Sequence, residues 1–70
     1  MRLKVDCQLS SSEEHDLHRW VAAHNGFIDE VSVHLHTVVV RDSASKTSQM
    51  AFRQNRSLVQ ALDQAYRDLF

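Results

Sequence analysis

The stretch VSVHLHTVVV, residues 31–40, constrains the fold of this chain more than any other segment. Seven of its ten residues are valine, leucine or threonine, a composition that favours extended backbone. As one continuous strand, residues 29–41 would span about 43 Å, which is long for a small domain. We therefore expect this strand to bend, to carry a bulge, or to project beyond the sheet toward another molecule.

The alternation along this expected strand assigns its side chains to two faces. One face would carry Val31, Val33, Leu35, Thr37 and Val39, and the other Glu30, Ser32, His34, His36, Val38 and Val40. Both faces of 37–40 are then largely apolar, and an exposed strand of this kind is prone to aggregate. Either the monomer buries both faces of this segment, or a second copy or another protein covers it.

The near absence of glycine and proline indicates that little of the chain forms loops. The 70 residues include one glycine, Gly26, and no proline, although these residues dominate turns. We expect one domain over 1–70, made mostly of helix and strand. Its core is small and its stability marginal, so that association with a partner or a second copy would help.

Two further segments predict strands. Residues 2–9 alternate between apolar and polar side chains, which is typical of a half-buried strand. The apolar side chains of this strand are Leu3, Val5, Cys7 and Leu9, and we expect them to face the core. Residues 47–53 alternate in the same way, and the polar turn 41–46 would join them to the long strand as a hairpin.

A serine followed three residues later by glutamate predicts the start of the first helix. Ser10 with Glu13, or Ser11 with Glu14, fits a capping box, in which each residue's side chain bonds the other's backbone N–H. Apolar residues then follow at helical spacing as far as residue 24. We expect a helix over 11–24.

Ser57 and Gln60 form a second capping-box pair and predict a helix over 56–69. The predicted order of elements is therefore β-α-β-β-α. We expect an α+β fold, a two-layer sandwich in which both helices pack on one face of a three-stranded sheet.

The two histidines of the long strand are candidate ligands or pH-sensitive groups. His34 and His36 would share a face, but a metal site needs three or four ligands and no others are expected beside them. The chain also lacks the spacings of known nucleophile, phosphate-binding and zinc-protease motifs. We therefore expect no metal, no cofactor, no small-molecule substrate and no enzymatic activity.

A basic cluster offers a different kind of site. Residues 1–35 carry three lysines or arginines and six acids, whereas residues 36–70 carry five lysines or arginines and three acids. The clustered basic residues are Arg41, Lys46, Arg53 and Arg56. If Arg41 and Arg53 meet at the base of a hairpin with Lys46 at its tip, this edge could contact phosphate groups.

The sequence thus predicts a small non-enzymatic regulatory protein that binds a larger protein or forms a homodimer through the 31–41 strand. The predicted contact residues are His34, His36, Val38 and Val40. The alternative is a nucleic-acid- or ribosome-binding regulator that uses the basic 41–56 hairpin. With one cysteine and neither a signal peptide nor an apolar membrane span, we expect a cytoplasmic location without membrane contact.

Overall fold

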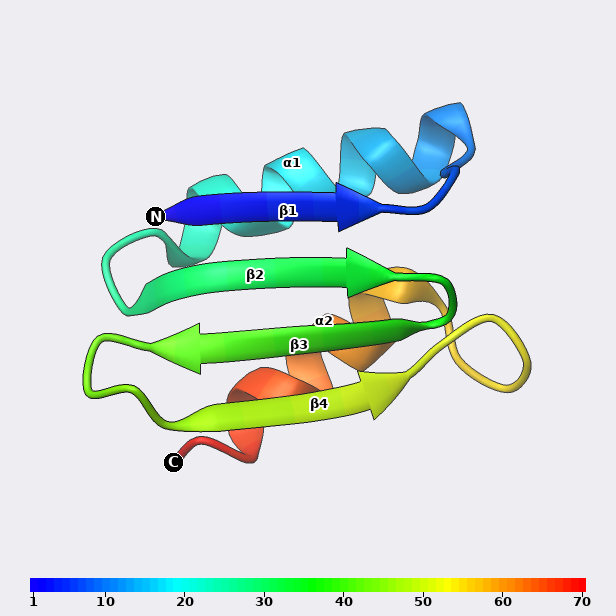
Figure 1. Ribbon diagram of the computed structural model, residues 1–70. Helices are drawn as coiled ribbons and strands as arrows, with labels where there is room; N and C mark the ends of the chain where they lie inside the picture. Colours follow the sequence, from blue (N-terminus) through cyan, green and yellow to red (C-terminus); the bar gives the residue numbers. More distant parts are fainter.

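Four β-strands and two α-helices make up the fold, which a computed structural model describes over residues 1–70 (Figure 1). The elements are β1 (Arg2–Asp6), α1 (Ser11–His24), β2 (Ile28–His34), β3 (Thr37–Asp42), β4 (Thr47–Ala51) and α2 (Leu58–Arg67). The sheet has the order β1-β2-β3-β4, with β1 parallel to β2 and the other neighbours antiparallel. Both helices lie on one face of the sheet, so the fold is α+β with two layers. Neither helix is long and apolar enough to cross a membrane.

The prediction of a three-stranded sheet is wrong, because the 29–41 segment forms two strands rather than one. β2 ends at His34, Leu35 and His36 form a turn, and β3 runs back from Thr37. Leu35 has a φ of 54°, in the left-handed region. This region costs a residue with a side chain about 1–2 kcal/mol. Because neither leucine nor histidine is a typical turn residue, the composition of this segment does not indicate the turn.

Compared with one continuous strand, the turn places each side chain of β3 on the other face of the sheet. Val33 pairs directly with Val38 across the two strands, so both point to the same face of the sheet. Val38 and Val40 are therefore fully buried against the helices. The prediction that these two valines share a face with His34 and His36 is wrong, because a two-residue turn reverses the alternation.

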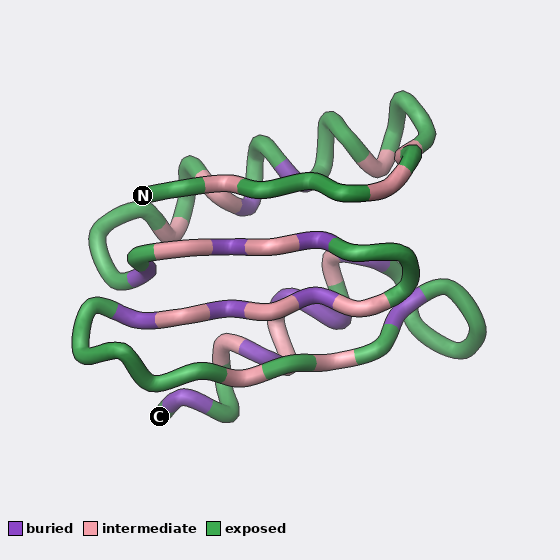
Figure 2. The backbone as a smooth tube through the Cα atoms, in the orientation of Figure 1, coloured by how far each residue is buried: buried purple, intermediate pink, exposed green.

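The core lies between the sheet and the helices, as the buried segments in Figure 2 show. It combines alternate side chains of the strands with one stripe from each helix. Its buried members are Leu17, Trp20, Ile28, Val31, Val33, Val38, Val40, Phe52, Leu58, Ala61, Leu62, Ala65 and Leu69. β1 contributes no fully buried side chain, whereas both strands of the central hairpin, β2 and β3, do.

Both predicted capping boxes are present. The Ser10 hydroxyl accepts from the Glu13 backbone N–H at 3.2 Å, and the Ser10 backbone N–H donates to Glu13 at 3.0 Å. Ser57 and Gln60 make the same pair of bonds, at 3.1 and 2.8 Å. α1 has the predicted bounds, and α2 is shorter at both ends than predicted.

The loop between β3 and β4 is organised by the carboxylate of Asp42. Its Oδ1 accepts hydrogen bonds from the backbone N–H groups of Ala44, at 2.9 Å, and Lys46, at 2.8 Å. Asp42 is the one buried charged residue, and these bonds satisfy it. The predicted polar turn in this part of the chain is confirmed.

Replacing valine by threonine tests the corrected register, because threonine has the shape of valine but adds a hydroxyl group. At Val38 the hydroxyl enters an apolar core, so Val38→Thr should lower the unfolding free energy by about 1–3 kcal/mol. The matched Val39→Thr change, on the partly exposed open face, should alter it by less than about 0.5 kcal/mol. Urea unfolding measures both, and equal losses would contradict this register.

Candidate functional site

A groove of about 280 Å³ lies between β1 and α1 at one edge of the sheet. It is lined by Leu3, Val5, Cys7, Leu9, Glu14, Leu17 and His18, of which the first four and Leu17 are apolar. We call this site the β1 groove. Its volume is just below the range of about 300–1,000 Å³ that is typical of small-molecule sites.

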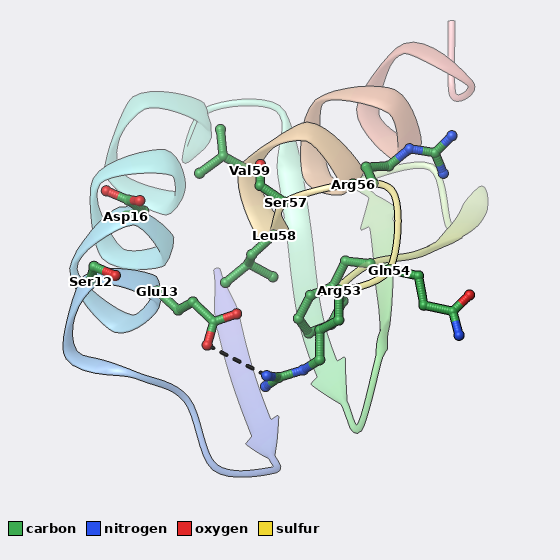
Figure 3. A pocket seen from close by; sticks show the side chains of 10 residues that line it. Ser12, Glu13, Asp16, Arg53, Gln54, Arg56, Ser57, Leu58 and Val59 are labelled. Carbon is green, nitrogen blue, oxygen red and sulfur yellow. Dashed lines mark ion pairs between the residues drawn. The ribbon is translucent and has the colours of Figure 1, made fainter.

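The β1 groove is open because α1 does not seal β1. Leu3 and Val5 stand in register with Val31 and Val33 of β2, which are fully buried. Val5 nevertheless keeps 45% of its surface exposed. In Figure 1, α1 runs obliquely behind β1, and its first turns lie beyond β1 on the side away from β2; Figure 3 shows the start of α1 on the same side. The helix thus overhangs the sheet edge instead of covering its last strand.

Contacts with α2 hold α1 in this offset position. The Trp20 indole N–H donates to Asp63 Oδ1 at 2.8 Å. The His24 ring stacks on Trp20 with a centroid distance of 3.9 Å, and it meets the edge of Tyr66 at 4.8 Å. These contacts join one flank of α1 to the second helix, and the opposite flank borders the β1 groove.

The backbone edge beside the groove is unpaired. The sheet order makes β1 and β4 the outer strands, and an outer strand presents free N–H and C=O groups. On β1 the side chains of the open face are charged: Arg2, Lys4 and Asp6. β4 differs, because it carries no charge and α2 packs over it.

A cluster of cations surrounds Glu30 on the open face of the sheet. Its carboxylate lies 2.6 Å from Arg41, 3.3 Å from Arg2 and 3.5 Å from Lys4. Burial acts to raise the pKa of Glu30, but the combined attraction of Lys4, Arg41 and Arg2 outweighs it and holds the pKa below its ordinary value. This network links β1 to the central hairpin.

The four residues predicted to bind a partner do not form one surface. His34 lies at the end of β2 and bonds Asp6 at 2.8 Å, and His36 is exposed in the turn. Val38 and Val40 are fully buried. Because β2 and β3 are interior strands with both edges paired, another strand cannot be added at 31–41, and homodimerisation through this segment stays a prediction.

The four basic residues of the alternative prediction are also separated. Arg41 lies near the β3–β4 loop, which contains Lys46, whereas Arg53 and Arg56 follow the other end of β4. The Lys46 ammonium donates to the Leu69 carbonyl at 2.8 Å, and each arginine contacts groups of its own chain. The expected meeting of Arg41 and Arg53 at the base of a hairpin is therefore wrong.

Arg53 instead joins three separate segments, at the rim of a polar cleft of about 500 Å³ (Figure 3). Its guanidinium donates to the carbonyls of Leu35, at 3.2 Å, and Gln8, at 3.0 Å. It also pairs with the Glu13 carboxylate at 3.7 Å. The cleft's Glu13 and Ser57 cap the two helices, so these two side chains serve the fold.

No group of three or more His, Cys, Asp or Glu side chains is placed to hold a metal ion. Comparisons with protein-family models, curated proteins and solved structures found no match. The β1 groove and the strand edge beside it are therefore the features that bear on function.

Sequence reasoning assigned Leu3, Val5 and Cys7 to the core and so missed the groove. The alternation correctly places these side chains on the helix-facing side of the sheet, but it does not indicate which strand lies at a sheet edge. One usable signal was the scarcity of apolar residues in α1, which buries only Leu17 and Trp20. A helix with so narrow an apolar stripe cannot cover two strands and a second helix at once.

Replacing Glu30 with glutamine tests the cation cluster through pH. A folded-state pKa below the unfolded value stabilises the fold above the unfolded pKa, near 4.3, and this stabilisation is lost as pH falls through the folded pKa. The wild type should therefore lose more unfolding free energy than Glu30→Gln between about pH 5 and pH 3. Asp16→Asn, outside the cluster, should keep the wild-type profile. Parallel profiles for wild type and Glu30→Gln in urea unfolding would contradict the assignment.

Substitutions at Arg53 test whether its backbone is strained. Its φ is 94°, which glycine adopts at little cost. Arg53→Gly and Arg53→Ala both remove the guanidinium contacts, but the glycine variant should be more stable by about 1 kcal/mol. At Arg56, where φ is not positive, the alanine variant should be the more stable of the pair. Thermal unfolding compares all four variants, and an alanine advantage at Arg53 would show that no strain is stored there.

Proposed function

We propose that this chain is a small non-enzymatic regulatory protein that binds a larger protein at the β1 groove. The observation that carries the proposal is the open apolar groove beside an unpaired strand edge. Val5 has 45% of its surface exposed within a run of apolar neighbours, and such patches commonly mark interaction sites. The β1 groove replaces the 31–41 strand as the contact surface.

The chemistry of the groove favours a protein over other partners. An apolar lining flanked by free backbone donors and acceptors matches a polypeptide, which offers side chains and backbone groups together. A nucleic acid would instead need several cations free to contact phosphates. The four basic residues each contact groups of their own chain, and they lie at the two ends of the β3–β4 hairpin; they are Arg41, Lys46, Arg53 and Arg56.

The polar cleft at Arg53 supports the non-enzymatic part of the proposal. Catalysis by an activated side chain requires a nucleophile or base with a bonded partner that orients it. In this cleft Glu13 and Ser57 bond backbone N–H groups at helix starts, and Arg53 bonds backbone carbonyls. These contacts fix the positions of loops and helix ends.

A charge in the groove should abolish partner binding. Val5→Glu places a carboxylate among apolar side chains, and because Val5 is already half exposed the fold should lose less than about 1 kcal/mol. Immobilised wild-type protein should retain specific proteins from the source cells that Val5→Glu fails to retain. The Cys7 thiol of the wild type, which lines the same groove, should react more slowly with an alkylating reagent in the recovered complex.

The matched control is Gln49→Glu, which adds the same charge to the other outer strand, β4. This variant should retain the same proteins as the wild type. Equal retention by Val5→Glu, or unchanged alkylation of Cys7 in the complex, would contradict binding at the β1 groove.

A further inference from the structure

We infer that the β1 groove receives an extended segment of another protein, which pairs with β1 as a fifth strand and carries alternating apolar and acidic side chains. This inference rests on the proposed function and adds the conformation and charge of the bound segment. Three features carry it: the offset of α1, the steric consequence of that offset for a second copy, and the cations of β1.

The offset of α1 leaves space for one more strand beneath the helix. Neighbouring strands lie about 4.8 Å apart, and a helix with its side chains is about 10–12 Å wide. Because the first turns of α1 lie beyond β1, a strand added to β1 would lie under the flank of α1 that borders the groove. Its alternate side chains would then contact Val5 and Cys7.

The same offset prevents a second copy from occupying the site through its own β1. Two paired β1 strands would place two α1 helices on one face of a continuous sheet, each over or beyond its own β1. Their axes would be separated by about 5 Å or less, whereas packed helices require about 8–10 Å. A segment that brings no helix to this face meets no such obstacle.

The charges of β1 select the outward-facing side chains of the bound strand. Arg2 and Lys4 lie on the open face with 64% and 66% of their side-chain surfaces exposed, although both also contact Glu30. A side chain on an added strand would stand directly beside them. Arg2 also lies 4.0 Å from Asp29. Acidic residues at these positions would add a further ion pair to each cation, whereas basic residues would be repelled. Asp6, farther along β1, is already paired with His34.

The test is titration of the full chain with an N-acetylated eight-residue peptide of alternating valine and glutamate. Backbone amide signals of β1 should shift in NMR spectra, and alkylation of Cys7 should slow as the peptide binds. Two control peptides test the alternation of side chains and the acidic charge separately. One has the same composition with its valines contiguous, and the other replaces glutamate by lysine. Both should bind at least about tenfold more weakly, the equivalent of about 1.4 kcal/mol.

Variants of the chain locate the contact. Val5→Glu should abolish binding of the alternating peptide, and Lys4→Glu should weaken it by about tenfold or more. Lys4→Glu should also reverse the preference, so that the valine–lysine peptide becomes the better ligand. Gln49→Glu on β4 should leave the affinity unchanged. The solution mass of the free chain should remain that of a monomer over the titration range.

Each contrary result overturns a defined part of the inference. Equal affinity for the alternating and block peptides, or no binding of either, excludes the extended segment, and equal affinity for the glutamate and lysine peptides excludes the acidic preference. A dimer mass that Val5→Glu abolishes identifies a second copy as the occupant. If Val5→Glu still loses cellular partners while the peptide fails, the proposed function stands and this inference falls.

Discussion

The turn at Leu35 and His36 determines how the rest of the sheet is built. It folds the apolar run back on itself, so that Val38 and Val40 face the core beside Val33 and its neighbours. A fully buried valine contributes about 1.5 kcal/mol or more, so two valines outweigh the roughly 1–2 kcal/mol cost of the left-handed Leu35. The strained turn is therefore favourable as a whole, and it converts an aggregation-prone strand into a buried hairpin.

This strained turn is connected to the position of α1 through Arg53. The Arg53 guanidinium donates to the Leu35 carbonyl of the turn and to the Gln8 carbonyl after β1, and it forms an ion pair with the Glu13 carboxylate at the start of α1. One side chain thereby fixes the β1–α1 connection relative to the central hairpin. Leu9 follows Gln8 and Glu14 follows Glu13, so the residues that Arg53 contacts stand next to two residues that line the groove.

Local signals in the sequence were sufficient for the helices but not for the turn or the groove. The capping serines Ser10 and Ser57 act within four residues, so spacing alone identifies them. The three positive-φ residues are Leu35, Ser45 and Arg53, none of them a glycine or asparagine. Tertiary contacts support such positions, and sequence patterns do not record those contacts. The apolar face of β1 was likewise predictable, but its place at an uncovered edge follows from how α1 packs on α2.

The open edge also follows from the size of the chain. Seventy residues provide a small core, and α1 places its narrow apolar stripe, Leu17 and Trp20, in that core and packs against α2. β1 is consequently left half covered, and a bound strand would complete the layer by burying Val5. The charges of Arg2 and Lys4 limit this completion to suitable partners, because edge cations oppose unselective strand pairing. In the proposed function, the apolar surface that the monomer leaves exposed is the binding site, and its occupant would be selected by charge and by the absence of a competing helix.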